Sequence, residues 1–152
     1  MKLSEALVLR SDVNKRIQQI RTRITGSTVV QEGEQPPENP QELLVQIDAL
    51  FVQFQDLIAR INRTNITAML SSGETLTNAL ARRDVIRYRM EVVRTVAESA
   101  VTTTDRYSRS EIRKVATVDI AALRKQADNL AQEYRELDFA IQEANWTTEL
   151  IE

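Results

Sequence analysis

The stretch LSEAL at residues 3–7 returns 73 residues later as LTNAL at residues 76–80. The ungapped match continues through four further pairs: Arg10 with Arg83, Val13 with Ile86, Ile17 with Met90, and Ile20 with Val93. A second match pairs residues 61–64 with residues 144–147, at an offset of 83. Self-similarity at a fixed offset is typical of one supersecondary unit used twice. We therefore predict a duplicated unit, with repeats at about residues 1–66 and 74–148.

Apolar residues recur at alternating spacings of three and four, which indicates amphipathic helices. We predict helices from Ser4 to about Thr25, from Pro40 to before Ser71, from Leu76 to Val101, and from after Asp119 into the tail. The predicted apolar seam of the first helix is Leu3, Leu7, Val13, Ile17, Ile20 and Ile24, and that of the second is Leu44, Ile47, Phe51, Phe54, Ile58 and Ile61. The predicted seam of the third helix is Leu80, Ile86, Met90, Val93 and Ala97, and that of the fourth is Leu123, Ala127, Leu130, Tyr134, Leu137, Ile141 and Ala144. These helices predict an all-α, up-down-up-down four-helix bundle or coiled coil, as a single domain over residues 1–152.

Two long connections interrupt the pattern, at residues 26–40 and 102–118. Each contains a stretch with strand-like composition, residues 27–31 in the first and residues 112–118 in the second. Both lie at the same end of the predicted bundle, so they could pair as a small β-ribbon. Loops of this length in a compact bundle are typically functional or ordered excursions.

The composition excludes several classes of function. The chain has no Cys and no His, which removes thiolate metal sites, the commonest general base and the commonest metal ligand. A net charge of −2 gives no overall attraction to nucleic acid or anionic membranes. No nucleotide-binding or catalytic motif is present, and the N-terminus lacks a signal-peptide core. We expect a cytoplasmic, non-enzymatic protein with no cofactor and no metal.

The repeat places Arg10 and Arg83 at equivalent positions inside the apolar seams. In antiparallel hairpins they would lie near the ends of the second and fourth helices. Those ends carry four polar residues: Asn62, Thr64, Asn145 and Thr147. One interpretation is a candidate anion or carboxylate site, because guanidinium groups match planar oxyanions. The other is a polar layer in which Asp56, Glu136 or Glu143 pairs with the arginines and fixes the register.

A second candidate site lies in the long connection of the second repeat. Its basic and aromatic residues are Arg106, Tyr107, Arg109, Arg113 and Lys114. Such a segment could track a phosphate backbone, although Asp105 and Glu111 interrupt it. The alternative is a contact with a protein partner, to which the tail from Trp146 to Ile151 could also contribute. Further candidate packing or interface residues are Phe51, Phe54 and Tyr88.

Charges on the third and fourth helices are complementary outside the seams. The third helix carries Arg82, Arg87, Arg89 and Arg94, and the fourth carries Asp128, Glu133, Glu136, Asp138 and Glu143. We expect ion pairs between neighbouring helices or subunits, each with a small net energy when exposed.

Four segments together resemble the small bacterial proteins of the septicolysin-like family. They are residues 1–7 (MKLSEAL), 57–65 (LIARINRTN), 106–113 (RYSRSEIR) and 143–150 (EANWTTEL). The resemblance spans the whole chain and provides no catalytic residues. Its label implies a haemolysin, a toxin that damages membranes.

The sequence alone does not identify an activity. Our leading hypothesis is a helical-bundle protein that forms homo-oligomers and binds a protein partner. The alternatives are a septicolysin-like toxin acting on membranes, and a nucleic-acid-associated protein that uses residues 106–114.

Overall fold

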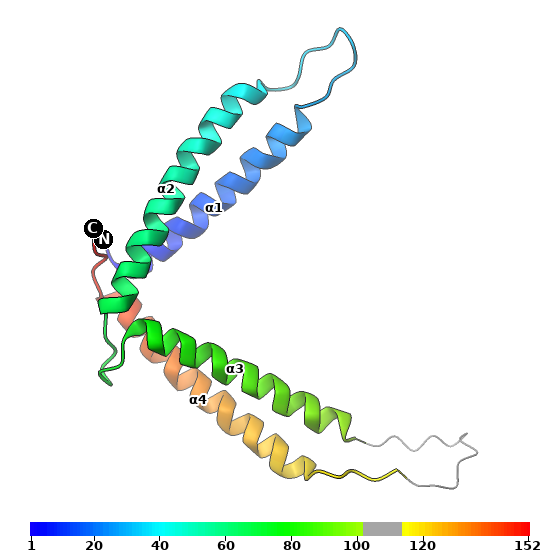
Figure 1. Ribbon diagram of the computed structural model, residues 1–152, viewed down its shortest axis with the longest axis vertical. Coiled ribbons are helices and arrows are strands. Elements are labelled where there is room, and N and C mark those ends of the chain that lie inside the picture. The colour runs from blue at the N-terminus through cyan, green and yellow to red at the C-terminus, as the bar shows by residue number, and fades with distance from the viewer. Residues whose placement is uncertain (102–113) are drawn as a thin grey trace, which may run out of the picture. The chain divides into compact units, whose positions relative to one another are not determined.

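A computed structural model confirms the all-α prediction (Figure 1). The structure describes residues 1–101 and 114–152. Its four helices are α1 (Leu3–Gly26), α2 (Pro40–Thr67), α3 (Leu76–Ser99) and α4 (Ile120–Thr147). An antiparallel bridge of extended backbone joins Lys2 and Glu149 near the two chain ends.

Contacts within the chain divide it into two compact units. The first comprises Met1–Met69 and Glu143–Glu152, and the second comprises Leu70–Gln142. In the first unit α1 packs along α2 as an antiparallel hairpin (Figure 1). In the second unit α3 and α4 form the other hairpin, joined by ion pairs from Arg82 to Glu133 and from Arg83 to Asp138. The last turn of α4 belongs to the first unit.

Local signals in the sequence explain where the helices begin. The Asn39 side chain accepts a hydrogen bond from the Gln41 amide at 3.0 Å, and Pro40 occupies the first helical position, as predicted. Asp119 caps α4 by accepting from the Ala122 amide at 3.0 Å. The first helix begins at Leu3, one residue before the predicted start at Ser4. The cap residue is Lys2, whose amide donates to the Glu5 carboxylate at 2.7 Å.

The predicted seam is confirmed most fully in α4, where five of its members are buried: Ala127, Leu130, Leu137, Ile141 and Ala144. In α1 and α3 the seams pass through Ala6 and Ala79, whereas the predicted Leu7 and Leu80 are only half-buried. In α2 only Ile47 and Ile61 of the six predicted seam residues are buried, while Phe54 and Ile58 are half-buried. The buried residues are Leu43, Ile47, Leu50, Leu57, Ile61 and Thr64, while the predicted Leu44 and Phe51 are exposed.

The structure also corrects the second offset of the repeat. Because α2 spans Pro40–Thr67 and α4 spans Ile120–Thr147, equivalent residues are 80 apart, not 83. This alignment pairs identical residues at eight places along the two helices: Leu43 with Leu123, Gln46 with Gln126, Asp48 with Asp128, Leu50 with Leu130, Leu57 with Leu137, Ile61 with Ile141, Asn65 with Asn145, and Thr67 with Thr147. The 83-residue match was a coincidence of two similar polar segments, shifted by almost one helical turn.

The connection between α1 and α2 contains no strand. Its described residues, 27–39, form turns and irregular backbone, with Gly33 at a φ of 90°. Arg23 and Glu38 pair across the ends of this connection, and the hydrogen bond from Arg23 lowers the pKa of Glu38. Residues 114–118 also form no strand, and the rest of the second predicted strand lies outside the described residues. The described chain therefore shows no β-ribbon.

Candidate functional site

The most unusual surface of the first unit is the outer face of α2. Leu44, Phe51 and Ile58 are seven residues apart, so they follow one line along the helix. Leu44 and Phe51 are exposed, and Ile58 is half-buried. These are the side chains that the sequence analysis placed in the core. They instead lie outside the buried seam of α2, with Leu44 and Phe51 facing solvent and Ile58 at the edge of the core.

A second apolar line runs beside the first, one residue further along the helix. It consists of Val45, Val52, Ala59 and Ile66. Val45 and Val52 are each 71% exposed and Ile66 is 64% exposed. A row of Asp48, Gln55 and Asn62 lies between the two lines, because residues three or four apart are neighbours on a helix surface. We call these two lines and the row between them the α2 outer face.

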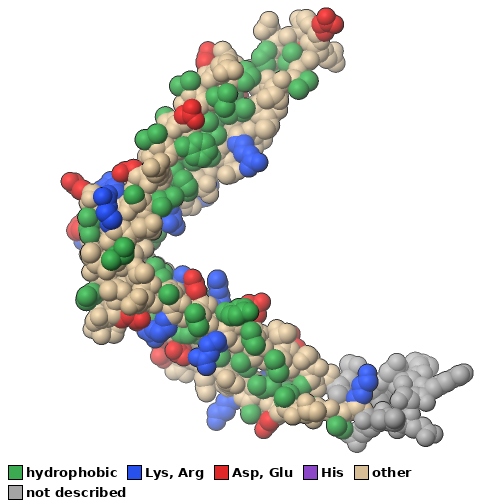
Figure 2. All heavy atoms as spheres, in the orientation of Figure 1, with side chains coloured by type: hydrophobic (Ala, Val, Ile, Leu, Met, Phe, Trp, Pro, Cys, Tyr) green, Lys and Arg blue, Asp and Glu red, His purple; other side chains and the backbone are tan. Residues whose placement is uncertain are grey.

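Figure 2 shows hydrophobic side chains spread along the unit that contains α1 and α2. The equivalent face of α4 has a different character. Positions 44 and 45 correspond to Arg124 and Lys125, and positions 51 and 52 correspond to Ala131 and Gln132. The apolar character at positions 44, 45, 51 and 52 is therefore specific to α2, whereas positions 59 and 66 correspond to the exposed Phe139 and Trp146 on α4. Contiguous exposed apolar surface of this kind marks interaction sites.

The equivalent residues Arg10 and Arg83 have different surroundings. Arg83 pairs with Asp138 at 3.1 Å and with Asp84 at 3.6 Å, in a half-buried position. Its partner is thus Asp138, and not the predicted Glu136 or Glu143. Arg10 is half-buried and forms no ion pair within residues 1–69 and 143–152. The position equivalent to Asp138 in the first repeat is Ile58, so the first hairpin lacks this carboxylate.

The other residues of the predicted polar cluster lie in the first unit. Thr64 is fully buried, and its hydroxyl donates to the Arg60 carbonyl at 2.8 Å and accepts from the Ile151 amide at 3.0 Å. Thr147 donates to the Glu143 carbonyl at 2.9 Å. Asn145 is buried, and Asn62 is exposed. Thr64 and Thr147 thus satisfy backbone groups, and in this unit no hydrogen bond joins Arg10 to any member of the cluster.

The two chain ends meet in the first unit. The Leu3 amide donates to the Thr148 carbonyl at 3.0 Å, and the Leu150 amide donates to the Met1 carbonyl at 2.9 Å. The Lys2 ammonium lies 2.7 Å from the Glu149 carboxylate. Its hydrogen bond, followed by that of the N-terminal ammonium, lowers the pKa of Glu149. Arg60 adds a hydrogen bond from Nε to the Ile151 carbonyl at 3.2 Å.

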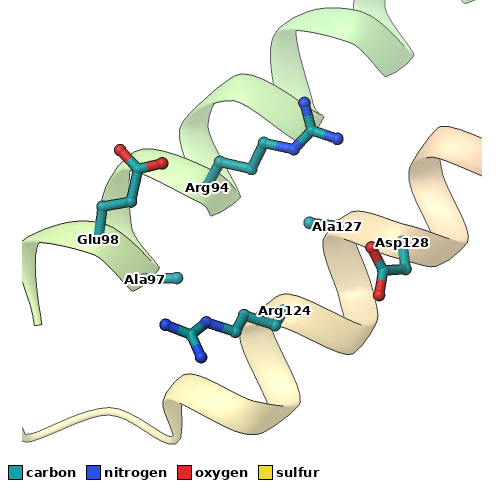
Figure 3. A pocket seen from close by; sticks show the side chains of 6 residues that line it. All are labelled: Arg94, Ala97, Glu98, Arg124, Ala127 and Asp128. Carbon is teal, nitrogen blue, oxygen red and sulfur yellow. The ribbon is translucent and has the colours of Figure 1, made fainter. Parts of the chain in front are cut away.

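A pocket of about 300 Å³ opens between α3 and α4 (Figure 3). Ala97 and Ala127 form its floor, where the equivalent residues of the first hairpin are the larger Ile24 and Ile47. Four exposed charged residues surround it: Arg94, Glu98, Arg124 and Asp128. Because two cations and two anions line this pocket, its charges balance and do not select an anionic or a cationic ligand.

Most of the predicted partner-contact residues lie outside the described residues. These are Arg106, Tyr107, Arg109 and Arg113. Lys114 is described and exposed, in the connection that precedes α4. Trp146 is also described, on the last turn of α4, and is 67% exposed. The structure therefore retains Trp146 as a surface candidate and does not test the basic segment.

The described residues contain neither a membrane-spanning helix nor a cluster of metal ligands. None of the described helices combines the length and apolar character that crossing a membrane requires. Nowhere in residues 1–101 and 114–152 do three or more acidic side chains come close enough together to hold a metal ion. The expectation that the protein uses no metal stays a prediction.

The fold defines a class of duplicated helical-hairpin proteins. Residues 10–150 match a protein family described as "Family of unknown function (DUF6847)", and the chain belongs to this family. It is similar to a solved crystal structure of a functionally unknown conserved protein from Corynebacterium diphtheriae. The two share 43% identity over 99% of each chain, with a TM-score of 0.92. No curated protein matches the chain.

Proposed function

We propose that the protein is a cytoplasmic, non-enzymatic interaction protein that self-associates through the α2 outer face. The observation that supports this proposal is the pair of exposed apolar lines along α2, with Val45 and Val52 each 71% exposed. Regular seven-residue spacing suits a second helix, since it keeps the same side chains facing a partner over several turns. A globular ligand would not need that periodicity.

The sequence of α2 favours an antiparallel partner. With Gln55 facing Gln55 of a second copy, Phe51 would lie opposite Ala59 and Val52 would lie opposite Ile58 of that copy. In the pair of Phe51 with Ala59 a large side chain meets a small one, which allows the two surfaces to interdigitate. In this register Asp48 would meet Asn62, so the central polar row would be satisfied across the interface.

The charges on α2 support the same orientation. The N-terminal half of the helix carries two negative charges, from Glu42 and Asp48. The C-terminal half carries Arg60, Arg63 and Asp56, which pairs with Arg60, so its net charge is positive. An antiparallel pairing brings opposite charges together, whereas a parallel pairing brings like charges together. Such complementarity contributes more to orientation and specificity than to affinity.

The test uses the absence of Cys from the natural sequence. Gln55→Cys places one thiol at the centre of the proposed interface, where two copies can form a disulfide. Arg135→Cys is the matched control, because residue 135 is the exposed equivalent of Gln55 on α4. We expect rapid covalent dimers of Gln55→Cys under mild oxidation, and slow or no dimers of Arg135→Cys.

A noncovalent measurement completes the test. Native mass spectrometry should show twice 17.3 kDa for the natural protein and mainly 17.3 kDa for Phe51→Asp, since a carboxylate would be buried at the contact. A natural protein that stays monomeric at high concentration, with equal cross-linking of both Cys variants, would refute self-association through α2.

The septicolysin-like resemblance supports one other function, a membrane-damaging activity. The exposed apolar lines of α2 offer a surface that could enter a lipid interface. This alternative predicts dye leakage from liposomes, abolished by Phe51→Asp, and the absence of leakage across lipid compositions would exclude it.

Nucleic-acid contact through residues 106–114 stays a prediction. It is tested by salt-dependent binding, which should weaken when Arg106 and Arg109 are neutralised.

A further inference from the structure

A shallow apolar groove of about 280 Å³ lies beside the only tryptophan of the chain. Trp146 forms one wall, and one face of α1 forms the other. The residues of α1 that line it are Ser4, Glu5, Val8, Leu9 and Asp12. All of them, and Trp146, belong to the first unit. The proposed α2 contact does not involve this groove.

Three features of the groove point to a ligand. Trp146 and Val8 are 67% and 61% exposed, so a large apolar area meets solvent. Two carboxylates, from Glu5 and Asp12, border this apolar area. Ser4 is 9% exposed, and its hydroxyl is buried with no hydrogen-bond partner in the described part of the chain. A buried polar atom without a partner costs free energy that a bound ligand can recover.

The charges around the groove leave it acidic. Glu5 accepts the Lys2 amide hydrogen bond through one oxygen, so its negative charge is not neutralised by a cation there. Asp12 has only the exposed Lys15 nearby, at 3.6 Å, and pairs of this kind are weak. The Lys2 ammonium is already bound by Glu149 and by the Thr147 carbonyl. The unneutralised side chains at the groove are thus carboxylates.

The second repeat shows that the fold does not require this arrangement. The residues equivalent to Glu5, Asp12 and Trp146 are Asn78, Val85 and Ile66. Both carboxylates and the indole are therefore absent from the corresponding positions. Among the described residues, the indole, the two carboxylates and the unpartnered hydroxyl come together in the first unit, where Trp146 of α4 lies beside α1.

We propose that this groove binds an alkylguanidinium group. A guanidinium stacks on an indole face, donates several N–H groups in a planar fork, and is more weakly hydrated than an ammonium. Its N–H groups can donate to the Ser4 hydroxyl and to one of the two carboxylates, Glu5 or Asp12, which lie about two helical turns apart on α1. The other carboxylate attracts the cation through space, and the alkyl chain covers Val8 and Leu9. The source of the group is either a free small molecule or an arginine side chain of a partner protein.

Fluorescence of Trp146 reports directly on the groove, because the chain has no other tryptophan. The probe is ethylguanidinium, and its neutral isostere ethylurea is the matched control. We expect saturable changes in emission with ethylguanidinium, at a dissociation constant on the order of millimolar for so small a ligand. Ethylurea at the same concentration should give no saturable change, and sodium chloride at equal ionic strength should give none.

Variants separate the proposed contacts from general effects. Asp12→Asn should weaken ethylguanidinium binding about fivefold, as expected for one charge near the surface. Glu5→Gln should weaken it similarly, while Gln retains the helix-capping hydrogen bond. Glu91→Gln on α3 is the control and should leave binding unchanged. Binding that is equal for ethylurea, or unchanged in both groove variants, would overturn the proposal.

A second ligand distinguishes the two sources of the guanidinium. If the peptide acetyl-Gly-Arg-Gly-amide binds at least tenfold more tightly than ethylguanidinium, contacts beyond the side chain contribute, and a partner protein is the source. Equal affinities indicate a free small molecule. Either result keeps the groove as a guanidinium site, and both are independent of whether α2 self-associates.

Discussion

The hairpin of α1 and α2 and the hairpin of α3 and α4 have the same helix lengths, 24 and 28 residues, and equivalent buried seams. Their surfaces differ. The first hairpin exposes an apolar outer face on α2 and two carboxylates on α1 that lie beside Trp146 of α4, while the second carries charged residues and a pocket floored by alanines. The shared positions build the hairpin. The positions that differ carry the candidate binding surfaces, so the two repeats serve as internal controls for each other.

The largest expected effect comes from the shared seam. Leu3 and Leu76 are equivalent and have no exposed area. Leu3→Ala and Leu76→Ala should each lower the free energy of unfolding by about 2–5 kcal/mol, the usual loss for a large-to-small core change. Leu44→Ala on the α2 outer face should cost less than about 1 kcal/mol in the monomer. Urea denaturation followed by circular dichroism measures all three, and unequal losses for Leu3 and Leu76 would break the equivalence of the repeats.

The next effect concerns Thr64, whose counterpart in the second repeat is Ala144. Thr64→Val keeps the shape of the side chain but removes both hydrogen bonds of its hydroxyl. We expect a loss of about 1–3 kcal/mol, because the Ile151 amide loses its partner. Hydrogen exchange of that amide should accelerate, while the Leu70 amide, which donates to Glu74, serves as the control. Unchanged exchange at Ile151 would show that Thr64 does not hold the C-terminal segment.

A smaller effect distinguishes the two seam arginines. Asp138→Asn removes the charge that faces Arg83, so the half-buried guanidinium keeps only Asp84. We expect a loss of about 1 kcal/mol, the upper range for partly exposed pairs. Arg10→Met should be neutral or stabilising, since Arg10 has no ion pair within its own unit. If Arg10→Met destabilises the protein as much as Asp138→Asn, then Arg10 has a partner of comparable strength, such as a bound anion.

The smallest effect is the pH dependence of the contact between the chain ends. The folded pKa of Glu149 is lowered by its hydrogen bonds with Lys2 and the N-terminal ammonium. Its contribution is therefore fully present above the unfolded pKa, about 4.3, and is lost as the pH falls through the lower folded value. Protection of the Leu150 amide should decrease over that interval in the natural protein. In Glu149→Gln the acid-dependent step should be absent, and a step that persists would assign it to another carboxylate.

Much of the fold was predictable because local chemistry determined it. The match of residues 3–7 with 76–80 identified the repeat, and Asn39-Pro40 and Asp119 marked two helix starts. The seam of α4 was also predicted correctly, since that helix has only one apolar line. In α2 two apolar heptads compete, one from Leu43 to Thr64 and one from Leu44 to Ile58. Periodicity alone does not show which of the two apolar lines of α2 is buried. The presence of two lines on one helix was itself the signal that one of them is exposed.

The candidate sites were less predictable, because each depends on residues distant in the sequence. Arg10 and Arg83 are equivalent by sequence, yet only Arg83 faces a carboxylate, since residue 58 is Ile where residue 138 is Asp. Trp146 was predicted as a contact residue, but its position beside Glu5 and Asp12 required the C-terminal segment to return to the start of α1.

The sequence by itself determined four amphipathic helices, their duplication and most of their ends, because hydrophobic periodicity and helix capping act over a few residues. Tertiary structure decided which apolar line of α2 is buried, which arginine is paired, and which side chains surround Trp146. Those outcomes depend on the register between helices, which is set by packing over the whole hairpin and by hydrogen bonds such as that from Ile151 to Thr64.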